Sequence, residues 1–217
     1  VTVLDPAAGT LTFLAEAATL AVNEFEDKYG SRGKEHFIKD HILKNFYAFE
    51  LMMAPYAIGH IKMSFLLEEL GYRMSEDDRC KFYLTNTLEM EELDQSAVPG
   101  LSSLSDESHL AGKVKKEQPV LVVLGNPPYS VSSANKSKFI DGYLDRKESI
   151  DKRGRRRTLN VYIKGILDDY KEAVSSEGNI QPLSDDYIKF IRFAHWKIDN
   201  AGEGVIGMIT NNSYLSG

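Results

Sequence analysis

Short apolar runs alternate with longer helix-like stretches along most of this chain of 217 residues. The runs typical of strands span residues 1–4, 46–50, 81–85, 120–124 and 205–210. The stretches typical of helices span residues 14–29, 34–44, 55–70, 161–174 and 186–199. This alternation predicts an α/β fold with a mostly parallel, doubly wound sheet. Two polar segments, residues 91–117 and 130–158, interrupt the pattern, and we expect both to form mobile loops.

The apolar run at residues 120–124 stops abruptly at Asn126-Pro127-Pro128-Tyr129. Proline cannot donate to a sheet ladder and holds the preceding residue extended, so we expect Asn126 at the carboxyl end of a buried strand. Ligands bind at that edge of an open α/β sheet. The Asn126 side-chain oxygen and the Pro127 carbonyl suit a flat amino group, and Tyr129 can stack on a nucleobase. The alternative is a Pro-Pro strand terminator without chemistry.

The amino terminus has the order strand, tight turn and helix. The first apolar run leads into the small-residue turn Asp5-Pro6-Ala7-Ala8-Gly9-Thr10, and a helix rich in Ala and Leu follows from Phe13. Such a unit cradles a nucleotide-type cofactor, because small residues let the backbone approach it closely. Asp5 would repel a phosphate, but its charge suits the ammonium and sulfonium groups of S-adenosylmethionine.

Two more polar residues end the next two predicted strands. Glu50 closes the second, where a carboxylate typically hydrogen-bonds ribose hydroxyls. Asn86 follows the third, where its side chain can read the amino edge or a ring nitrogen of the adenine in the cofactor. The alternatives are an ordinary exposed glutamate and a simple turn or N-cap asparagine.

Taken in order, these motifs resemble the amino-methyltransferase family that methylates adenine in DNA. The cofactor turn precedes the Asn-Pro-Pro-Tyr tetrapeptide, which is the order of the gamma group of that family. Residues 186–194 and 204–212 further resemble the methyltransferase domain of large single-chain restriction–modification enzymes, either the helicase-linked type I-like kind or type IIG. The resemblance spans nearly the whole chain and implies a Rossmann-like, S-adenosylmethionine-dependent methyltransferase fold.

The resemblance also implies roles for individual residues. The tetrapeptide would be catalytic, with Asn126 and Pro127 binding the target amino group and Tyr129 stacking on the flipped adenine beside Pro128. The residues that would bind the cofactor are Asp5, Pro6, Ala7, Gly9, Thr10, Phe13, Glu50 and Asn86. Two positions depart from the family: Leu11 stands where glycine is usual, which would reshape the turn or reduce cofactor affinity, and Asn86 stands where aspartate is more common.

Composition excludes fewer candidate functions than the motifs do. The formal net charge of −6 argues against strong duplex binding by this segment alone. The exception is a basic run that includes Arg155, Arg156 and Arg157, which we interpret as a phosphate contact or a solvated loop. The lone Cys80 and the absence of a signal peptide or a long apolar run fit a cytoplasmic, prokaryotic protein. We expect no metal site.

Three other functions fit parts of the pattern. A protein-glutamine methyltransferase uses the same tetrapeptide logic, an RNA-base methyltransferase is similar, and a non-catalytic DNA-binding or scaffold module would follow if Leu11 disabled the pocket. The position of the motifs suggests a core truncated at both ends and taken from a longer polypeptide. That polypeptide would also carry a target-recognition domain, with a nuclease or helicase as further partners. The exposed end strands would then favour self-association.

Overall fold

The computed structural model describes residues 1–90, 102–130, 135–150 and 156–210. Its main sheet has five parallel strands in the order β3-β2-β1-β4-β7. The strands are β1 (Val3–Asp5), β2 (Phe46–Glu50), β3 (Lys81–Leu84), β4 (Val122–Gly125) and β7 (Val205–Met208). All five predicted strands are present, the second with the predicted bounds and the others shifted by one or two residues. The Rossmann-like α/β prediction is therefore confirmed.

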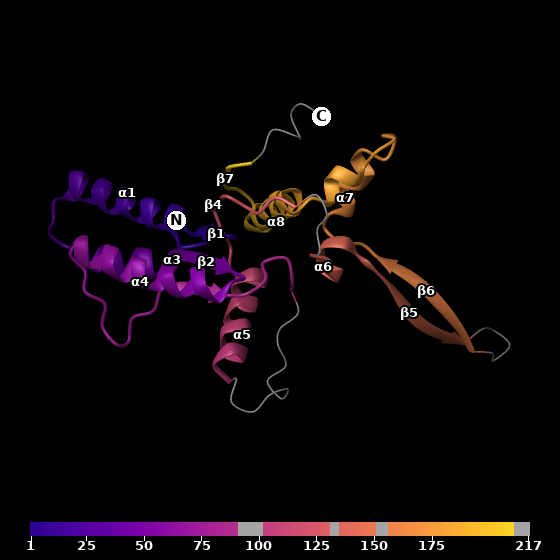
Figure 1. The fold of residues 1–217 in the computed structure, drawn as a ribbon, viewed down its shortest axis with the longest axis horizontal. Helices are drawn as coiled ribbons and strands as arrows, with labels where there is room; N and C mark the ends of the chain where they lie inside the picture. The colour runs from indigo at the N-terminus through magenta and orange to yellow at the C-terminus, as the bar shows by residue number, and fades with distance from the viewer. Residues whose placement is uncertain (91–101, 131–134, 151–155, 211–217) are drawn as a thin grey trace.

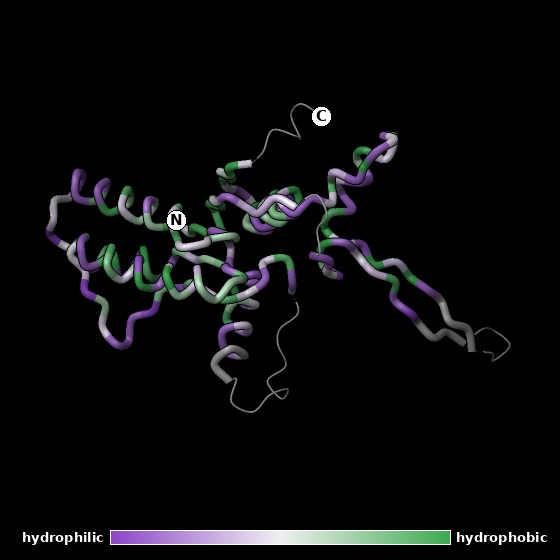
Figure 2. Tube along the Cα trace, viewed as in Figure 1, coloured by the Kyte–Doolittle hydropathy of each residue, from purple (hydrophilic) through white to green (hydrophobic). Residues whose placement is uncertain are grey.

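Helices cover both faces of this sheet, as Figure 1 shows. The helices on one face are α1 (Thr12–Tyr29), α4 (Met53–Glu69) and the winding segment of α2 (Lys34–Phe37), the π-helix η1 (Ile38–Ile42) and α3 (Leu43–Asn45). The other face is covered by α5 (Ser102–Lys116) and α8 (Asp186–Ala201). Figure 2 shows hydrophilic and hydrophobic stretches alternating along α1, as expected for a helix with one face against a core.

The strands supply alternate side chains to two hydrophobic cores. On β2, Ala48 packs with the α1 and α4 side, while Tyr47 and Phe49 pack with the α5 and α8 side. On β1, Val3 and Leu4 separate in the same way. This division follows from strand geometry, because successive side chains point to opposite faces of a sheet.

The prediction of a helix across residues 161–174 was wrong in its first part. Strand β6 (Arg156–Ile163) pairs antiparallel with β5 (Tyr143–Ile150), and a helix, α7, begins only at Asp168 and ends at Ala173. A Cβ on Gly165 would lie 2.3 Å from the Gly142 nitrogen, so the backbones at these two glycines cross closely at the base of the hairpin. The β5–β6 hairpin projects away from the sheet in Figure 1.

The two segments expected to be loops contain regular structure in their described parts. Helix α5 occupies residues 102–116, and α6 (Lys138–Asp141) precedes the hairpin. Residues 91–101, 131–134 and 151–155 of the expected loops lie outside the described residues. A short 3-10 helix, η2 (Gln181–Ser184), leads into α8, whose N-cap side chain, Asp185, accepts a hydrogen bond from the Tyr187 amide. None of the described helices is both long and apolar enough to span a membrane.

Candidate active site at the sheet switch point

Strands β1 and β4 lie side by side, with Val3 opposite Val122 and Leu4 opposite Val123. The chain order reverses between them, because β2 and β3 extend the sheet on one side of β1 and β4 and β7 on the other. Ligands in open α/β sheets bind outside the strand carboxyl ends at this switch point. The cofactor-type turn after β1 and the tetrapeptide after β4 therefore meet at one place.

The turn after β1 is fixed by backbone and side-chain hydrogen bonds. The Ala7 amide donates to Asp5 Oδ1 at 3.1 Å, and the Ala8 amide donates to the Phe49 carbonyl at 3.0 Å. The Thr87 hydroxyl donates to the Pro6 carbonyl and so ties the turn to the loop after β3. Gly9 has a φ of 54°, a left-handed conformation that glycine adopts without strain.

Asp5 is the most perturbed acid of the site. Its side chain is 0% exposed, and burial raises its pKa from the ordinary 3.8 to about 7, while the Ala7 amide lowers the pKa and the charge of Glu50 raises it. Oδ2 of Asp5 is buried and has no hydrogen-bond partner among the described residues. A carboxylate left half-satisfied in this way favours a cation or a hydrogen-bond donor at the strand end.

The close approach of β4 to Asp5 requires a residue without a side chain. A Cβ on Gly125 would lie 2.7 Å from Asp5 Oδ1. Since real Cβ contacts essentially never fall so short, any other residue at this position must displace the carboxylate. Because Gly125 directly precedes the tetrapeptide, this close contact with Asp5 fixes the position of the tetrapeptide relative to the turn after β1.

Leu11 adopts a left-handed backbone conformation of the kind that glycine favours. Its φ is 63° and its ψ 29°, and it is the N-cap residue of α1. The side chain is 0% exposed and packs in the core with Phe82 against Gly59, on the α4 side. The leucine therefore does not line the cavity at the switch point, and the turn keeps its shape at the cost of one strained residue.

Glu50 braces the turn from the second strand. Its Oε2 accepts from the Gly9 amide at 2.9 Å, and its Oε1 accepts from the Met52 amide at 2.7 Å. Each carboxylate oxygen has two lone pairs, so both retain capacity to accept from a hydroxyl group. The same side chain can therefore hold the turn and bind a ribose.

Asn86 is a turn residue as well as a wall of the site. Its Oδ1 accepts from the Leu88 amide at 3.1 Å, and its backbone carbonyl accepts from the Glu89 amide at 3.2 Å. The side-chain oxygen already accepts one hydrogen bond inside the loop, whereas the Asn86 NH₂ group is the side chain's donor toward a ligand. That group can only donate a hydrogen bond.

Asn126 follows β4, as the proline pattern predicts. Its Oδ1 accepts from the Tyr129 hydroxyl at 2.8 Å, and that hydroxyl also lies 3.1 Å from the Ile209 carbonyl. The Tyr129 ring is 46% exposed and sits 5.9 Å from the ring of Tyr187, centroid to centroid. The tyrosine hydroxyl thus occupies an acceptor that a flat amino group would use.

A cavity of about 290 Å³ joins these parts, and we call it the switch-point cavity. Its lining includes seven of the predicted residues: Pro6, Ala7, Gly9, Glu50, Asn86, Asn126 and Pro128. Asp5 lies buried beneath the turn, and Thr10, Phe13, Pro127 and Tyr129 stand close in sequence without lining the cavity.

Sequence reasoning missed the rest of the lining. These residues are Phe49, Leu51, Met52, Thr85, Thr87, Asn135 and Phe190. Those beside Glu50 and Asn86 could have been found from their position at strand ends. Asn135 and Phe190 could not, because only the docking of α8 brings them to the sheet edge, where the Asn135 amide donates to Asp186 Oδ2 at 3.1 Å.

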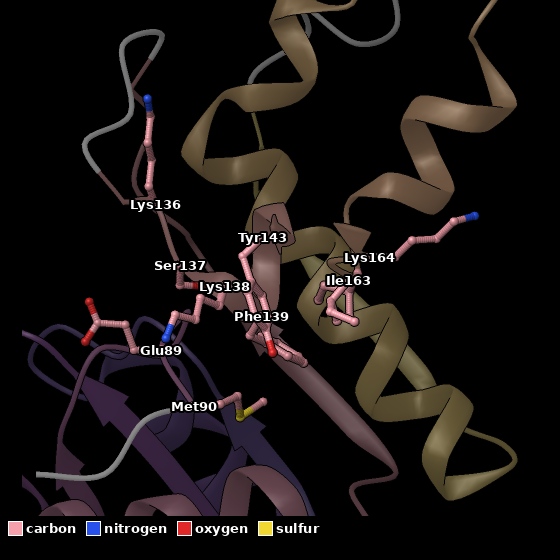
Figure 3. A pocket seen from close by; sticks show the side chains of 10 residues that line it. Glu89, Met90, Lys136, Ser137, Lys138, Phe139, Tyr143, Ile163 and Lys164 are labelled. Carbon is pink, nitrogen blue, oxygen red and sulfur yellow. The ribbon is translucent and has the colours of Figure 1, made fainter. Parts of the chain in front are cut away.

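A larger hollow of about 730 Å³ lies between the loop after β3, α6 and the base of the hairpin (Figure 3). Figure 3 shows Lys138 directed toward Glu89, while Lys136 and Lys164 point away from the hollow. The Lys138 amine is 5.4 Å from the centre of the Tyr143 ring. Among the described residues, none of those predicted for the site lines this hollow, so volume alone does not identify the candidate site.

Comparison with known proteins gives the fold. No family model and no curated protein matches the chain. Among solved structures, an ATP-dependent Type ISP restriction–modification enzyme, LlaBIII, bound to DNA covers 100% of this chain with 23% identity and a TM-score of 0.65. A nuclease-deletion mutant of the Type ISP enzyme LlaGI with a DNA substrate mimic gives 22% and 0.63, again over 100% of this chain. A DrdV–DNA complex gives 23% and 0.60, also over 100%.

The chain is much shorter than these three structures. It spans 13%, 16% and 18% of their respective lengths. At this level of identity the likeness shows a shared fold, which agrees with the strand order described above.

Proposed function

We propose that this chain is the methyltransferase core of a restriction–modification enzyme. It transfers a methyl group from S-adenosylmethionine to the exocyclic amino group of an adenine flipped out of DNA. One observation carries the proposal: the switch-point cavity is lined on one side by the turn after β1 with Glu50, and on the other by Asn126 and Pro128. A cofactor site and an amino-group acceptor thus share one cavity.

The residues of this cavity fit S-adenosylmethionine. The turn at Gly9 leaves open space for backbone approach, since a Cβ there would meet nothing within 4 Å. Asp5, with an unpartnered buried oxygen, suits the cationic methionine end, Glu50 suits the ribose and Asn86 the adenine. The likeness in fold to two DNA-bound restriction–modification enzymes is consistent with a place in such an enzyme.

The bound cofactor supplies an electrophilic methyl group, and the chain's own residues prepare the nucleophile. Asn126 Oδ1 and the Pro127 carbonyl each accept one hydrogen bond from the target amino group. These bonds favour the pyramidal nitrogen, whose lone pair is no longer delocalised into the ring. The nitrogen would form its bond to the methyl carbon as the S–C bond of the sulfonium breaks and leaves its electron pair on a neutral thioether sulfur. The methylated nitrogen would then be acidic and would release one proton to water.

Tyr129 already uses part of the acceptor that the target base would need. Its hydroxyl donates to Asn126 Oδ1 in this structure and so engages one of the two lone pairs of that oxygen. When the ring turns away, it offers a stacking face worth roughly 1–3 kcal/mol. That gain offsets part of the few kcal/mol that flipping a base out of the duplex costs.

The DNA partner is supported by the basic run and by the three DNA-bound neighbours. Arg155 lies outside the described residues, as do the side chains of Arg156 and Arg157, while the backbone of the last two belongs to β6. We propose that these arginines contact phosphates. Changing all three to alanine should then make the salt dependence of DNA binding shallower by about three units of slope. An unchanged slope would remove them from the interface.

The enzymatic proposal is tested by following an isotopically labelled methyl group. The protein is incubated with labelled S-adenosylmethionine and a duplex carrying bulged or mismatched adenines, which are cheap to flip and need no sequence reader. We expect label on the adenine amino nitrogen with the wild type and none with Asn126→Ala, which should still bind cofactor. Label on glutamine amides or on RNA added in parallel would replace the proposal. Bound cofactor without any transfer would favour a non-catalytic module.

A further inference from the structure

A buried lysine lies behind the wall of the switch-point cavity. Lys115, near the end of α5, is 3% exposed. Its amine donates to Thr85 Oγ1 at 2.7 Å and to the carbonyls of Asn86 at 2.6 Å and Glu89 at 2.9 Å. These three bonds clamp both ends of the loop that follows β3.

The loop held by Lys115 forms one wall of the cavity. Thr85, Asn86 and Thr87 all line it. The Lys115 amine also lies 5.5 Å from the centre of the Phe49 ring, which lines the cavity from β2. Since hydrogen bonds from a charged donor are about twice as strong as neutral ones, the three bonds from Lys115 contribute strongly to the fixing of this wall.

The clamp also decides which polar groups of the wall a ligand can use. The Asn86 carbonyl accepts from both Lys115 and the Glu89 amide, and Asn86 Oδ1 accepts from the Leu88 amide. The Thr85 hydroxyl oxygen accepts from Lys115. The wall therefore presents the Asn86 NH₂ group in a fixed direction, as a donor for a ring nitrogen.

We propose that Lys115 is a positioning residue for the adenine end of the cofactor. It acts through Asn86 and Thr85 and does not itself touch the cofactor. The inference rests on the proposed function, because it takes the cavity to be the S-adenosylmethionine site. It adds a residue from α5, which ends well before the tetrapeptide, to the set that determines cofactor affinity.

A second buried lysine provides a matched control. Lys197 of α8 is 2% exposed, and its amine donates to three carbonyls, those of Val114 at 3.0 Å, Lys115 at 2.9 Å and Gln118 at 2.7 Å. It has the same chemistry and the same degree of burial, and it anchors the same end of α5. It does not line the switch-point cavity or bond to the loop after β3.

The test compares Lys115→Met with Lys197→Met by titration with two ligands. One ligand is S-adenosylmethionine, and the other is 5′-methylthioadenosine, which keeps the adenine and ribose but lacks the amino acid. Lys115→Met should weaken both ligands by the same factor, about tenfold, which corresponds to roughly 1.4 kcal/mol. Lys197→Met should leave both affinities within about twofold of wild type, although both variants lower the unfolding temperature.

Three results would overturn the inference. They are unchanged affinity in Lys115→Met, a loss for S-adenosylmethionine that 5′-methylthioadenosine does not share, and an equal loss in Lys197→Met. If Lys115→Met does not fold, Lys115→Leu takes its place, because it also fills the buried space with an apolar side chain that cannot donate a hydrogen bond, and the same three results apply. Wild-type protein that binds neither ligand would instead refute the proposed function itself.

Discussion

Replacing Asp5 with asparagine should stabilise the protein, and more so at higher pH. The folded state raises the pKa of Asp5 from 3.8 to about 7, chiefly through burial. The folded protein therefore holds a proton that the unfolded chain releases. The contribution of Asp5 to stability falls as pH rises from 3.8 to about 7. It is constant above about pH 7, because the carboxyl is then ionised in both the folded and the unfolded state. Asparagine carries no charge and avoids this dependence.

The size of the effect follows from the two pKa values. One pH unit of separation between folded and unfolded pKa corresponds to about 1.4 kcal/mol. With 3.8 unfolded and about 7 folded, the ionisation cost is roughly 2 kcal/mol at pH 5 and roughly 4 kcal/mol at pH 8. The stability difference between Asp5→Asn and wild type should therefore grow by roughly 2–3 kcal/mol over this range.

Urea unfolding at pH 5, 6, 7 and 8 measures this growth directly. Asparagine can keep the bond from the Ala7 amide, and its NH₂ group replaces Oδ2, which has no partner among the described residues. Any cost of that replacement is independent of pH, so the slope isolates the ionisation. The control is Asp27→Asn on the exposed side of α1, where no burial cost acts on the carboxylate. A difference for Asp5→Asn that is constant from pH 5 to 8 would refute the reasoning.

Three further changes test other parts of the site. Leu11→Gly should lower the unfolding free energy by roughly 2–3 kcal/mol, because the loss of a buried leucine side chain outweighs the relief of left-handed strain. Urea unfolding should still find Leu11→Gly more stable than Leu11→Ala, because alanine keeps the strain. The reverse order of stability would contradict that account. Gly125→Ala should lower the unfolding free energy by roughly 1–3 kcal/mol and weaken cofactor binding. Gly178→Ala should do neither, because a Cβ there would meet nothing within 4 Å. Equal losses of stability in urea unfolding would argue against the close approach of Gly125 to Asp5. Tyr129→Phe removes the hydroxyl bonded to Asn126 Oδ1 and keeps the ring. Methyl-transfer kinetics should therefore show a kcat within about threefold of wild type and no rise in the KM for DNA. A kcat lower by 100-fold or more would mean that the hydroxyl takes part in catalysis.

The sequence predicts the sheet well because its signals are local. Alternating side chains define the strand at Phe46–Glu50, and the two prolines after Asn126 mark the end of β4. The hairpin was missed for the opposite reason. Val161, Tyr162 and Ile163 favour a strand by propensity, but a short apolar run is ambiguous by periodicity, and the pairing with residues 143–145 that decides between strand and helix is a tertiary contact.

The candidate site divides in the same way. Asp5, Glu50 and Asn126 stand at strand ends, where the order of the elements alone brings them together. The effect of Leu11 depended on where its side chain points, and the structure places it in the core. The loop clamp by Lys115 could not be foreseen, because it requires the docking of a helix in a segment that was expected to be a loop.

The central claim is that the switch-point cavity binds S-adenosylmethionine beside an amino-group acceptor. Isothermal titration of S-adenosylmethionine into the wild type, Glu50→Ala and Asn126→Ala tests it most directly. The account predicts micromolar binding by the wild type, loss of binding in Glu50→Ala because the ribose acceptor and the brace on Gly9 are both removed, and retained binding in Asn126→Ala. Wild-type protein that does not bind, or Glu50→Ala that binds as tightly as wild type, would contradict it.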